Sequence, residues 1–511
     1  MFPANYNKER VPESKGGPNL NVALYGDRIL SDQTLYEYLI EFLQVFTSPK
    51  TMDGAGKMRF HSSEQVKEGN LRYYVNLRVA LRRFIFYGRS KQEGRSAMDD
   101  LAYERMESLL HSIAQNGDQD IDLIHDLLIN YAIVTRNRGW YAQALMPVAP
   151  ELILAELQGI KQRQKNTRFD IDSKDIDGQF DYSKHNFLAR GGQVLYLNLL
   201  QGVMKSQDAD VKRERLEKLL VNMLESSGAG IGLLAEFVQS EWENERLENA
   251  ENPKIWQPRT FNMAFITDAF EIRAVRFVDE VTTFLSANIH PIARVELLAQ
   301  GLVVSLLRAM QLVADQKTGK TQGEPVWIMD MCGLGGTSNI AKLSAQSYAS
   351  SYETFQSALI KTFDELDGDA SERFPAVQKA KKDSSDVFKR LGKELKLIIP
   401  PRGNYERFSL SESLVRYFVL ALVEPQSKMI YDTFLEKLYD HFGIVIAPQT
   451  YRKALQSGVL QGSEDMADYF QINAHAFQEF LKQSGFLRDL SDATAIVENP
   501  YTAVQVRRHS S

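Results

Sequence analysis

SDQTLYEYLIEFLQVF, residues 31 to 46, decides the fold class of this chain. Its apolar side chains recur at steps of three and four residues, which places them on one face of an α-helix. They are Leu35, Leu39, Phe42, Leu43 and Phe46. Ser31 or Asp32 can cap the first turn. The stretch therefore predicts a helix with one face turned towards a core.

The same period recurs along most of the chain, with Gly or Pro near many of the ends. The segments are 101–113, 121–134, 194–204, 216–224, 261–285, 292–313 and 340–363. Strand-like runs are few and short: 326–331, 397–399 and pieces near the C-terminus. The sequence therefore predicts a mostly α protein, and its length of 511 residues predicts more than one domain.

Polar segments at 161–184, 248–260 and 364–386 lack a sustained apolar stripe and are expected to be linkers or exposed loops. They divide the chain into several segments, which predicts a multi-domain helical protein. We expect a flexible N-terminal arm (1–30), an N-terminal helical domain (31–165), a central helical domain with a short strand near 326–331 (186–363), a linker and basic helix (364–400), and a C-terminal domain with a disordered tail (401–511).

Composition narrows the classes of function. The net charge of −6, from 60 basic and 66 acidic residues, excludes a protein that coats nucleic acid with its whole surface. The single cysteine, Cys332, excludes an internal disulfide and a cysteine-rich zinc site, which fits a cytoplasmic location. The apolar run 297–313 carries Gln300, Arg308 and Gln311, so we expect a buried helix there and no membrane span.

Two stretches resemble phosphate-binding loops. Residues 314–321 lack one glycine of a P-loop, but a P-loop needs the order strand, loop, helix, and here a helix precedes and a strand follows. We therefore expect Lys320 in a solvated connecting loop. The second cluster, with Gly335, Gly336 and Thr337, lies between a possible strand and a helix start. It predicts a tight turn with Thr337 or Ser338 as the helix cap, and more weakly an anion site.

Catalytic and metal motifs are sparse. The eight histidines show no metal-ligand spacing, and the acidic stretch 170–181 has Lys174 where a calcium ligand should be, so we expect no metal and no cofactor. Glu394 and Lys396 form an E-x-K that could be a nuclease centre together with Asp383 or Asp386. A basic helix that runs into a strand explains the same residues, so an enzyme is the less favoured hypothesis.

Residues 71–95 mix basic and aromatic side chains, with seven Arg or Lys and one Glu. The pattern suits a nucleic-acid backbone or an acidic partner, and the candidate contacts are Arg72, Arg78, Arg82 and Arg83. The alternative is a helix with Val79, Phe84 and Phe86 in the core and arginines extended to the surface.

The last hundred residues predict three helices, in LSESLVRYFVLALVEP, MIYDTFLEKLYDHFG and INAHAFQEFLKQSG, followed by a hairpin around Ser491 and Asp492. This order resembles a winged helix-turn-helix domain, with an extra helix or loop inserted at 444–472. The resemblance implies that Asn473, His475, Gln478 and Lys482 face double-stranded DNA, with Arg488 on the wing. Glu479 and Asp489 oppose phosphate, so a protein ligand remains an equal alternative.

The whole chain is similar to large helical accessory subunits of bacterial anti-phage DNA-defence islands, including phosphorothioation-dependent restriction. The stretches that carry this similarity are LYGDRILSDQTLYEYLIEFL, HNFLARGGQVLYLNLL and the winged-helix-like end. It implies a non-catalytic subunit that positions DNA or a partner ATPase, translocase or nuclease. The alternatives are the nuclease at Glu394 and Lys396 and a purely structural scaffold.

Overall fold

A computed structural model of the chain describes residues 13–14, 17–26, 29, 33–69, 71–75, 107–130, 148–153, 158–159, 180–181, 191–227, 229–248, 257–260, 270–320, 324–333, 338–366, 370–491 and 494–505. Most of these residues are helical, as the sequence predicts. The strands are short and pair in small sheets of two or three.

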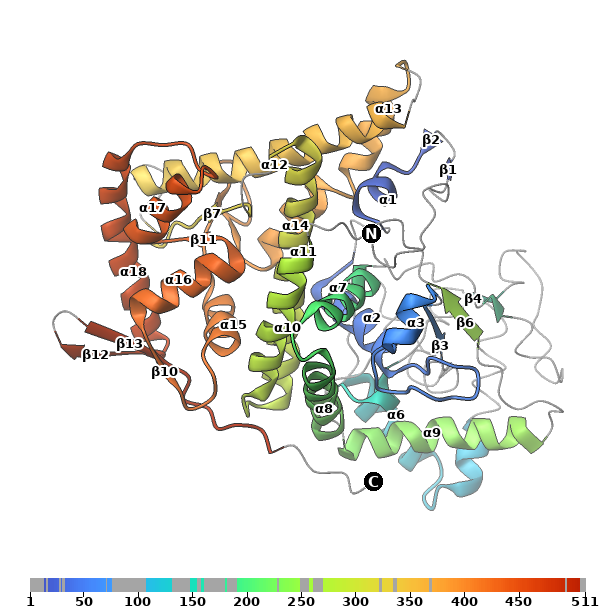
Figure 1. Cartoon of the computed structure of the whole chain (residues 1–511). Coiled ribbons are helices and arrows are strands. Elements are labelled where there is room, and N and C mark those ends of the chain that lie inside the picture. Colours follow the sequence, from blue (N-terminus) through green and yellow to red (C-terminus); the bar gives the residue numbers. More distant parts are fainter. Residues whose placement is uncertain are drawn as a thin grey trace.

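Helices of the N-terminal and central segments form the larger part of the fold (Figure 1). They are α1 (Leu20–Tyr25), α2 (Leu35–Thr47), α3 (Ser63–Lys67), α6 (Asp118–Asn130), α7 (Gly191–Lys205), α8 (Ala209–Ser227), α9 (Ala229–Glu248), α10 (Phe270–Ser286), α11 (Pro291–Thr318) and α12 (Asn339–Glu365). The strands of this part are β1 (Glu13–Ser14), β2 (Gly17–Pro18), β3 (Arg72–Val75), β4 (Gln158–Gly159), β5 (Phe180–Asp181), β6 (Gln257–Thr260) and β7 (Trp327–Ile328).

The rest of the chain continues with α13 (Arg373–Lys381), α14 (Ser385–Glu394), β8 (Ile398–Ile399) and β9 (Arg407–Phe408). The C-terminal elements are α15 (Glu412–Leu422), β10 (Lys428–Ile430), α16 (Tyr431–Phe442), β11 (Ile444–Val445), α17 (Pro448–Gln456), α18 (Tyr469–Gln483), β12 (Leu487–Ser491) and β13 (Thr494–Glu498).

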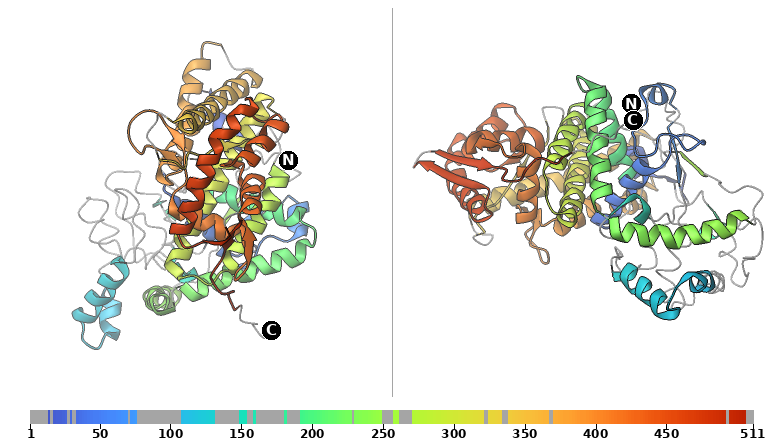
Figure 2. Two further views of the ribbon diagram at one scale, coloured as in Figure 1. Left: turned by 90° about the vertical axis from the view of Figure 1, so that its left-hand side faces the viewer. Right: turned by 90° about the horizontal axis from the view of Figure 1, so that it is seen from below.

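Helix α11 is the central element of the core. It contacts α2, α10, α12 and α15, and both figures place it between the N-terminal helices and the C-terminal elements (Figures 1 and 2). Among the described residues it is long and apolar enough to cross a membrane, but 94% of its most apolar window is buried inside the protein. The expectation of a buried core helix is therefore confirmed.

Two segments expected to be loose are packed instead. In the presumed flexible arm, α1 buries Leu20, Val22, Leu24 and Tyr25. In the presumed linker 364–400, the helices α13 and α14 bury apolar side chains such as Phe388. The two segments meet, because Nδ2 of Asn21 donates to the Ala380 carbonyl at 2.9 Å. The expectation of a flexible arm is wrong at α1. Within 364–400 a basic helix forms as expected, but it is packed against the core and is not a loose linker, since each short apolar stripe finds a partner far away in sequence.

A large hydrophobic cluster contains buried residues from Leu20 to Val497, on both sides of the expected domain boundaries, and a smaller second cluster joins β7 to α17 and α18. Strand β7 from the central segment pairs in parallel with β11 of the C-terminal part, with Trp327 opposite Ile444. Gly443 makes this approach possible, because a Cβ there would lie 2.3 Å from the carbonyl oxygen of Pro325. It also ends α16 with φ of 62°, the left-handed conformation that glycine adopts without strain.

A buried ion pair within α10 also contacts α16. Nη1 and Nη2 of Arg273 donate to the two carboxylate oxygens of Glu280 at 2.6 and 2.7 Å. Nδ1 of His441 lies 3.0 Å from Oε1 of the same carboxylate. Burial alone raises the pKa of Glu280, but Arg273 and His441 lower it by more, so this pKa lies below its usual range.

Candidate interaction surface

The C-terminal elements α15, β10, α16, α17, α18, β12 and β13 form the candidate interaction surface. The hairpin of β12 and β13 forms as the sequence predicts. β10 adds a third strand, antiparallel to β13, so that β13 lies in the middle of the sheet. β10 is not expected from the sequence, because the pattern of MIYDTFLEKLYDHFG predicts that Met429 and Ile430 belong to the following helix, which begins only at Tyr431. The inserted helix expected within 444–472 is α17.

Asn473 faces the interior of the protein. Its side chain is 0% exposed, and Nδ2 donates to the carbonyls of Met329 and Ile446, both at 2.9 Å. Oδ1 accepts from the backbone N–H of Met331 at 2.8 Å. Asn473 therefore satisfies backbone groups where the chain leaves β7 and β11, and the expectation that it contacts bases is wrong.

Its place in the sequence carried a signal for this. α18 buries Phe470, Asn473, Phe477 and Leu481, which follow one another at three- and four-residue steps. Asn473 thus shares the apolar face of the helix, and a polar residue on such a face is buried with hydrogen-bond partners more often than it is exposed.

The expected DNA-facing cations are exposed but ion-paired. Lys482 Nζ lies 2.6 Å from Oδ2 of Asp489 on the wing, and the hydrogen bond from Lys482 lowers the pKa of that carboxyl. Arg488 Nε lies 2.5 Å from Oε1 of Glu498, whose other oxygen is 3.8 Å from Nζ of Lys428. These basic groups are therefore neutralised locally, by partners that only the register of β10, β12 and β13 brings near.

The neighbouring surface of α18 carries apolar side chains. Ile472 is 67% exposed and Tyr469, one turn earlier, is 41% exposed. Ile430, at the end of β10, is 55% exposed. It directly precedes Tyr431, whose hydroxyl donates to the Ala474 carbonyl of α18 at 2.7 Å. His475 is also exposed, while Gln478 and Glu479 are half-buried.

The candidates near the N-terminus are placed only in part. Arg72 is exposed on β3, which pairs antiparallel with β6, so the helix considered for this stretch is wrong at 72–75. Arg78, Arg82 and Arg83 lie outside the described residues.

The candidate anion site before α12 is also placed only in part. Gly335, Gly336 and Thr337 lie outside the described residues. Ser338 caps α12 by accepting from the N–H of Ala341 at 3.1 Å, as one of the two expected caps.

The geometry needed by the nuclease hypothesis does not form. Glu394 is the last residue of helix α14 and pairs with Arg390 at 3.2 Å, and Lys396 occupies a turn with φ of 57° before β8 begins. The side chain of Asp386 accepts from the hydroxyl of Tyr352 at 3.0 Å. Within the part of the chain that the structure describes, no three His, Cys, Asp or Glu side chains gather closely enough to share a metal ion.

The segment that resembles a P-loop has the predicted order of elements, which is helix, loop and strand. α11 ends at Thr318, Gly319 caps it in the left-handed conformation, and Lys320 follows in the connection to β7. Its Nζ donates to Oγ1 of Thr354 at 2.7 Å. The lysine follows a helix and does not open one, as the sequence predicts.

Comparisons with known proteins give no relative from which a role could be transferred. No protein-family model, no curated protein and no solved structure matches the chain.

Proposed function

We propose that this chain is a binding subunit of a multi-protein complex, and that its C-terminal unit, residues 412–498, docks a partner protein through α18 and the adjacent sheet. One observation carries the proposal. Lys482 and Arg488 are already paired with carboxylates, whereas Ile472 and Tyr469 are exposed. Exposed apolar groups beside paired charges are typical of protein interfaces, where charged residues are depleted at the centre.

Binding to duplex DNA is the second candidate. The order of helices and strands, with β13 central in the sheet, supports a winged-helix-like unit, and winged helices place their third helix in a major groove. The pairing of the basic side chains on this surface argues against DNA binding. Phosphate contacts need unpaired cations, and binding here would require Lys482 and Arg488 to leave Asp489 and Glu498.

The partner that we propose is an ATPase, translocase or nuclease of a cytoplasmic anti-phage defence system. This part of the proposal rests on the resemblance of the chain to helical accessory subunits of such systems. A subunit with this role positions DNA or its partner and leaves the bond-breaking step to that partner.

A pair of matched substitutions tests the docking surface. The tagged full chain is expressed in its own cells, and cross-linked peptides are identified by mass spectrometry. We expect cross-links from residues 469–489 to one recurring partner, and their loss in Ile472→Asp. Leu233→Asp, which alters an apolar side chain 74% exposed on α9, serves as the control and keeps the partner.

The rival functions give different results. If binding to duplex DNA weakens steeply with salt and falls in Lys482→Glu/Arg488→Glu while Ile472→Asp has no effect, the surface reads DNA and the docking proposal is wrong. Metal-dependent cleavage of a plasmid that is lost in Glu394→Ala would instead identify the chain as a nuclease.

A further inference from the structure

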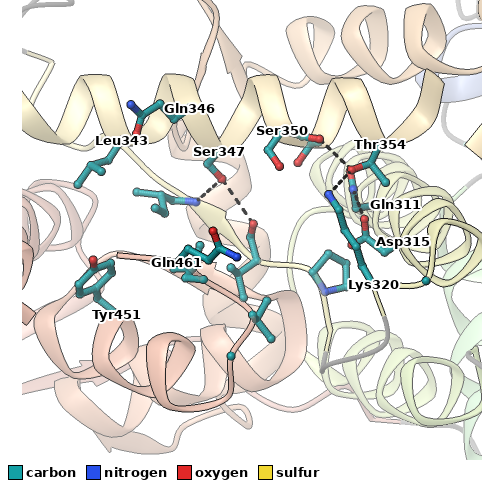
Figure 3. Close-up of a pocket in the computed structure, with 18 residues that line it drawn as sticks. Gln311, Asp315, Lys320, Leu343, Gln346, Ser347, Ser350, Thr354, Tyr451 and Gln461 are labelled. Carbon is teal, nitrogen blue, oxygen red and sulfur yellow. Dashed lines mark hydrogen bonds between the residues drawn. The ribbon is translucent and has the colours of Figure 1, made fainter. Parts of the chain in front are cut away.

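A groove of about 630 Å³ lies beside α12 and shares α17 with the candidate interaction surface, but none of its lining residues comes from α18 or from the sheet of β10, β12 and β13 (Figure 3). Its walls come from α12, the C-terminal end of α11, β7, α17 and the loop that follows α17. The volume falls within the range of about 300–1,000 Å³ that is usual for small-molecule sites.

The two ends of this groove differ in chemistry. In Figure 3, Tyr451 and Leu343 lie towards one end, and Lys320, Asp315 and Thr354 lie together at the other, with Gln461 between them. Gln311 and Ser350 also lie at the polar end, and the groove has further apolar lining from Val326, Ile328, Val459 and Leu460.

The polar end holds one group of each charge. Among the described residues, Lys320 hydrogen-bonds the neutral hydroxyl of Thr354, and because an ammonium has three donors, donors remain for a ligand. Asp315 Oδ1 accepts from Nε2 of Gln311 at 3.0 Å. Burial raises the pKa of Asp315, while Gln311 and Lys320 lower it by less.

Gln311 adds an unsatisfied acceptor at this end. The residue is 2% exposed, and its Oε1 atom has no hydrogen-bond partner within the part of the chain described. A buried acceptor without a donor is costly to a fold. A positively charged donor placed beside Asp315 would relieve that cost.

The balance of charge decides between classes of ligand. Lys320 and Asp315 cancel, and the C-terminal end of α11 contributes roughly half a negative charge. A di- or triphosphate would therefore be repelled, which agrees with the reversed order of the P-loop look-alike. Lys320 would repel an amine that has no carboxylate, and Asp315 would repel an acid that has no ammonium group. A molecule that carries both charges can pair with both residues.

We propose that the groove binds an amino-acid-like zwitterion with an apolar side chain. Its carboxylate pairs with Lys320, and its ammonium group pairs with Asp315 beside Gln311. The apolar side chain extends along the groove towards Leu343, Val459 and Leu460. This ligand site is separate from the docking surface and does not depend on it.

Calorimetry on the full chain with four probes tests the site. The probes are L-phenylalanine, phenethylamine without the carboxylate, 3-phenylpropionate without the ammonium group, and ATP. We expect L-phenylalanine to bind, and each probe that lacks one charge to bind about tenfold or more weakly, because a charge-assisted hydrogen bond is lost.

Two substitutions test which residue pairs with each charge of the ligand. Lys320→Met should weaken L-phenylalanine about tenfold and leave phenethylamine unchanged, and Asp315→Asn should weaken L-phenylalanine and leave 3-phenylpropionate unchanged. Lys317→Met is the control, because Lys317 lies in the last turn of α11, three residues before Lys320, pairs with Glu365 and does not line the groove.

Several results would overturn the proposal. They are no binding of L-phenylalanine at millimolar concentration, tighter binding of ATP, or equal losses in the Lys320 and Lys317 variants. None of them bears on the partner that cross-links to α18, so the two proposals fail separately.

Discussion

Glu280→Gln keeps the shape of a buried side chain and removes its charge. The carboxylate is 0% exposed and accepts two hydrogen bonds from Arg273, which is itself 3% exposed. In the variant, an amide NH₂ group would face the guanidinium, and Arg273 would remain buried without its counter-charge. The substitution therefore tests how strongly the α10 ion pair holds the core.

The expected magnitude follows from the burial. Removing one partner of a buried pair costs about 3–5 kcal/mol, and because glutamine keeps one acceptor oxygen, we expect about 3 kcal/mol. A chain of this length need not unfold in one step, so the assay is hydrogen exchange at the α10 amides, which measures the local opening free energy. Exchange should become faster by roughly two orders of magnitude.

A neighbouring ion pair supplies the control. Asp279 pairs with Lys212 at 2.5 Å, but the two side chains are 47% and 33% exposed. Asp279→Asn should therefore change the opening free energy by about 0–1 kcal/mol. The double variant Arg273→Met/Glu280→Leu should recover much of the loss, since no charge is left unpaired. If Glu280→Gln affects exchange no more than Asp279→Asn, the reasoning is refuted.

Three further outcomes are expected. Asn473→Ala should lower the local opening free energy of α18, measured by hydrogen exchange, by about 3 kcal/mol, because three backbone groups lose a buried partner. Gly301→Ala should destabilise the protein by about 1–3 kcal/mol in the same assay, because its Cβ would lie 2.1 Å from the ring of Tyr417. Burial raises the pKa of Glu406, but Lys389 and Lys393 lower it to about 2, below its ordinary 4.5, so its contribution to stability is complete above pH 4.5 and disappears as the pH falls towards 2.

Each of these three predictions has a control variant that distinguishes the expected effect from non-specific destabilisation. Gln471→Ala, on the exposed face of α18, should be nearly neutral. Gly230→Ala should stabilise α9 by up to about 1 kcal/mol, because nothing lies within 4 Å of the added Cβ. Glu406→Gln should remove its own part of the acid-induced loss. A wild type and a Glu406→Gln variant with the same pH dependence would contradict the assignment.

The sequence alone determined the helical class and the positions of the strongest helices. Periods of three and four residues predicted α2, α11, α12 and α15, because the spacing of apolar side chains is a local property of the chain. Glycines predicted the end of α16 at Gly443 for the same reason. The polar residues within 297–313 correctly indicated a core helix.

Only the tertiary structure decided which groups face which. The pairing of β7 with β11, the packing of α1 against α13, and the neutralisation of Arg488 by Glu498 all join segments that local patterns treat separately. The resemblance to a winged helix implies that Asn473 faces DNA, yet the ends of two strands supply it with hydrogen-bond partners in the interior. The role of a side chain depends on its burial and on the hydrogen-bond and ion-pair partners around it. These surroundings are set only when distant segments of the chain pack together.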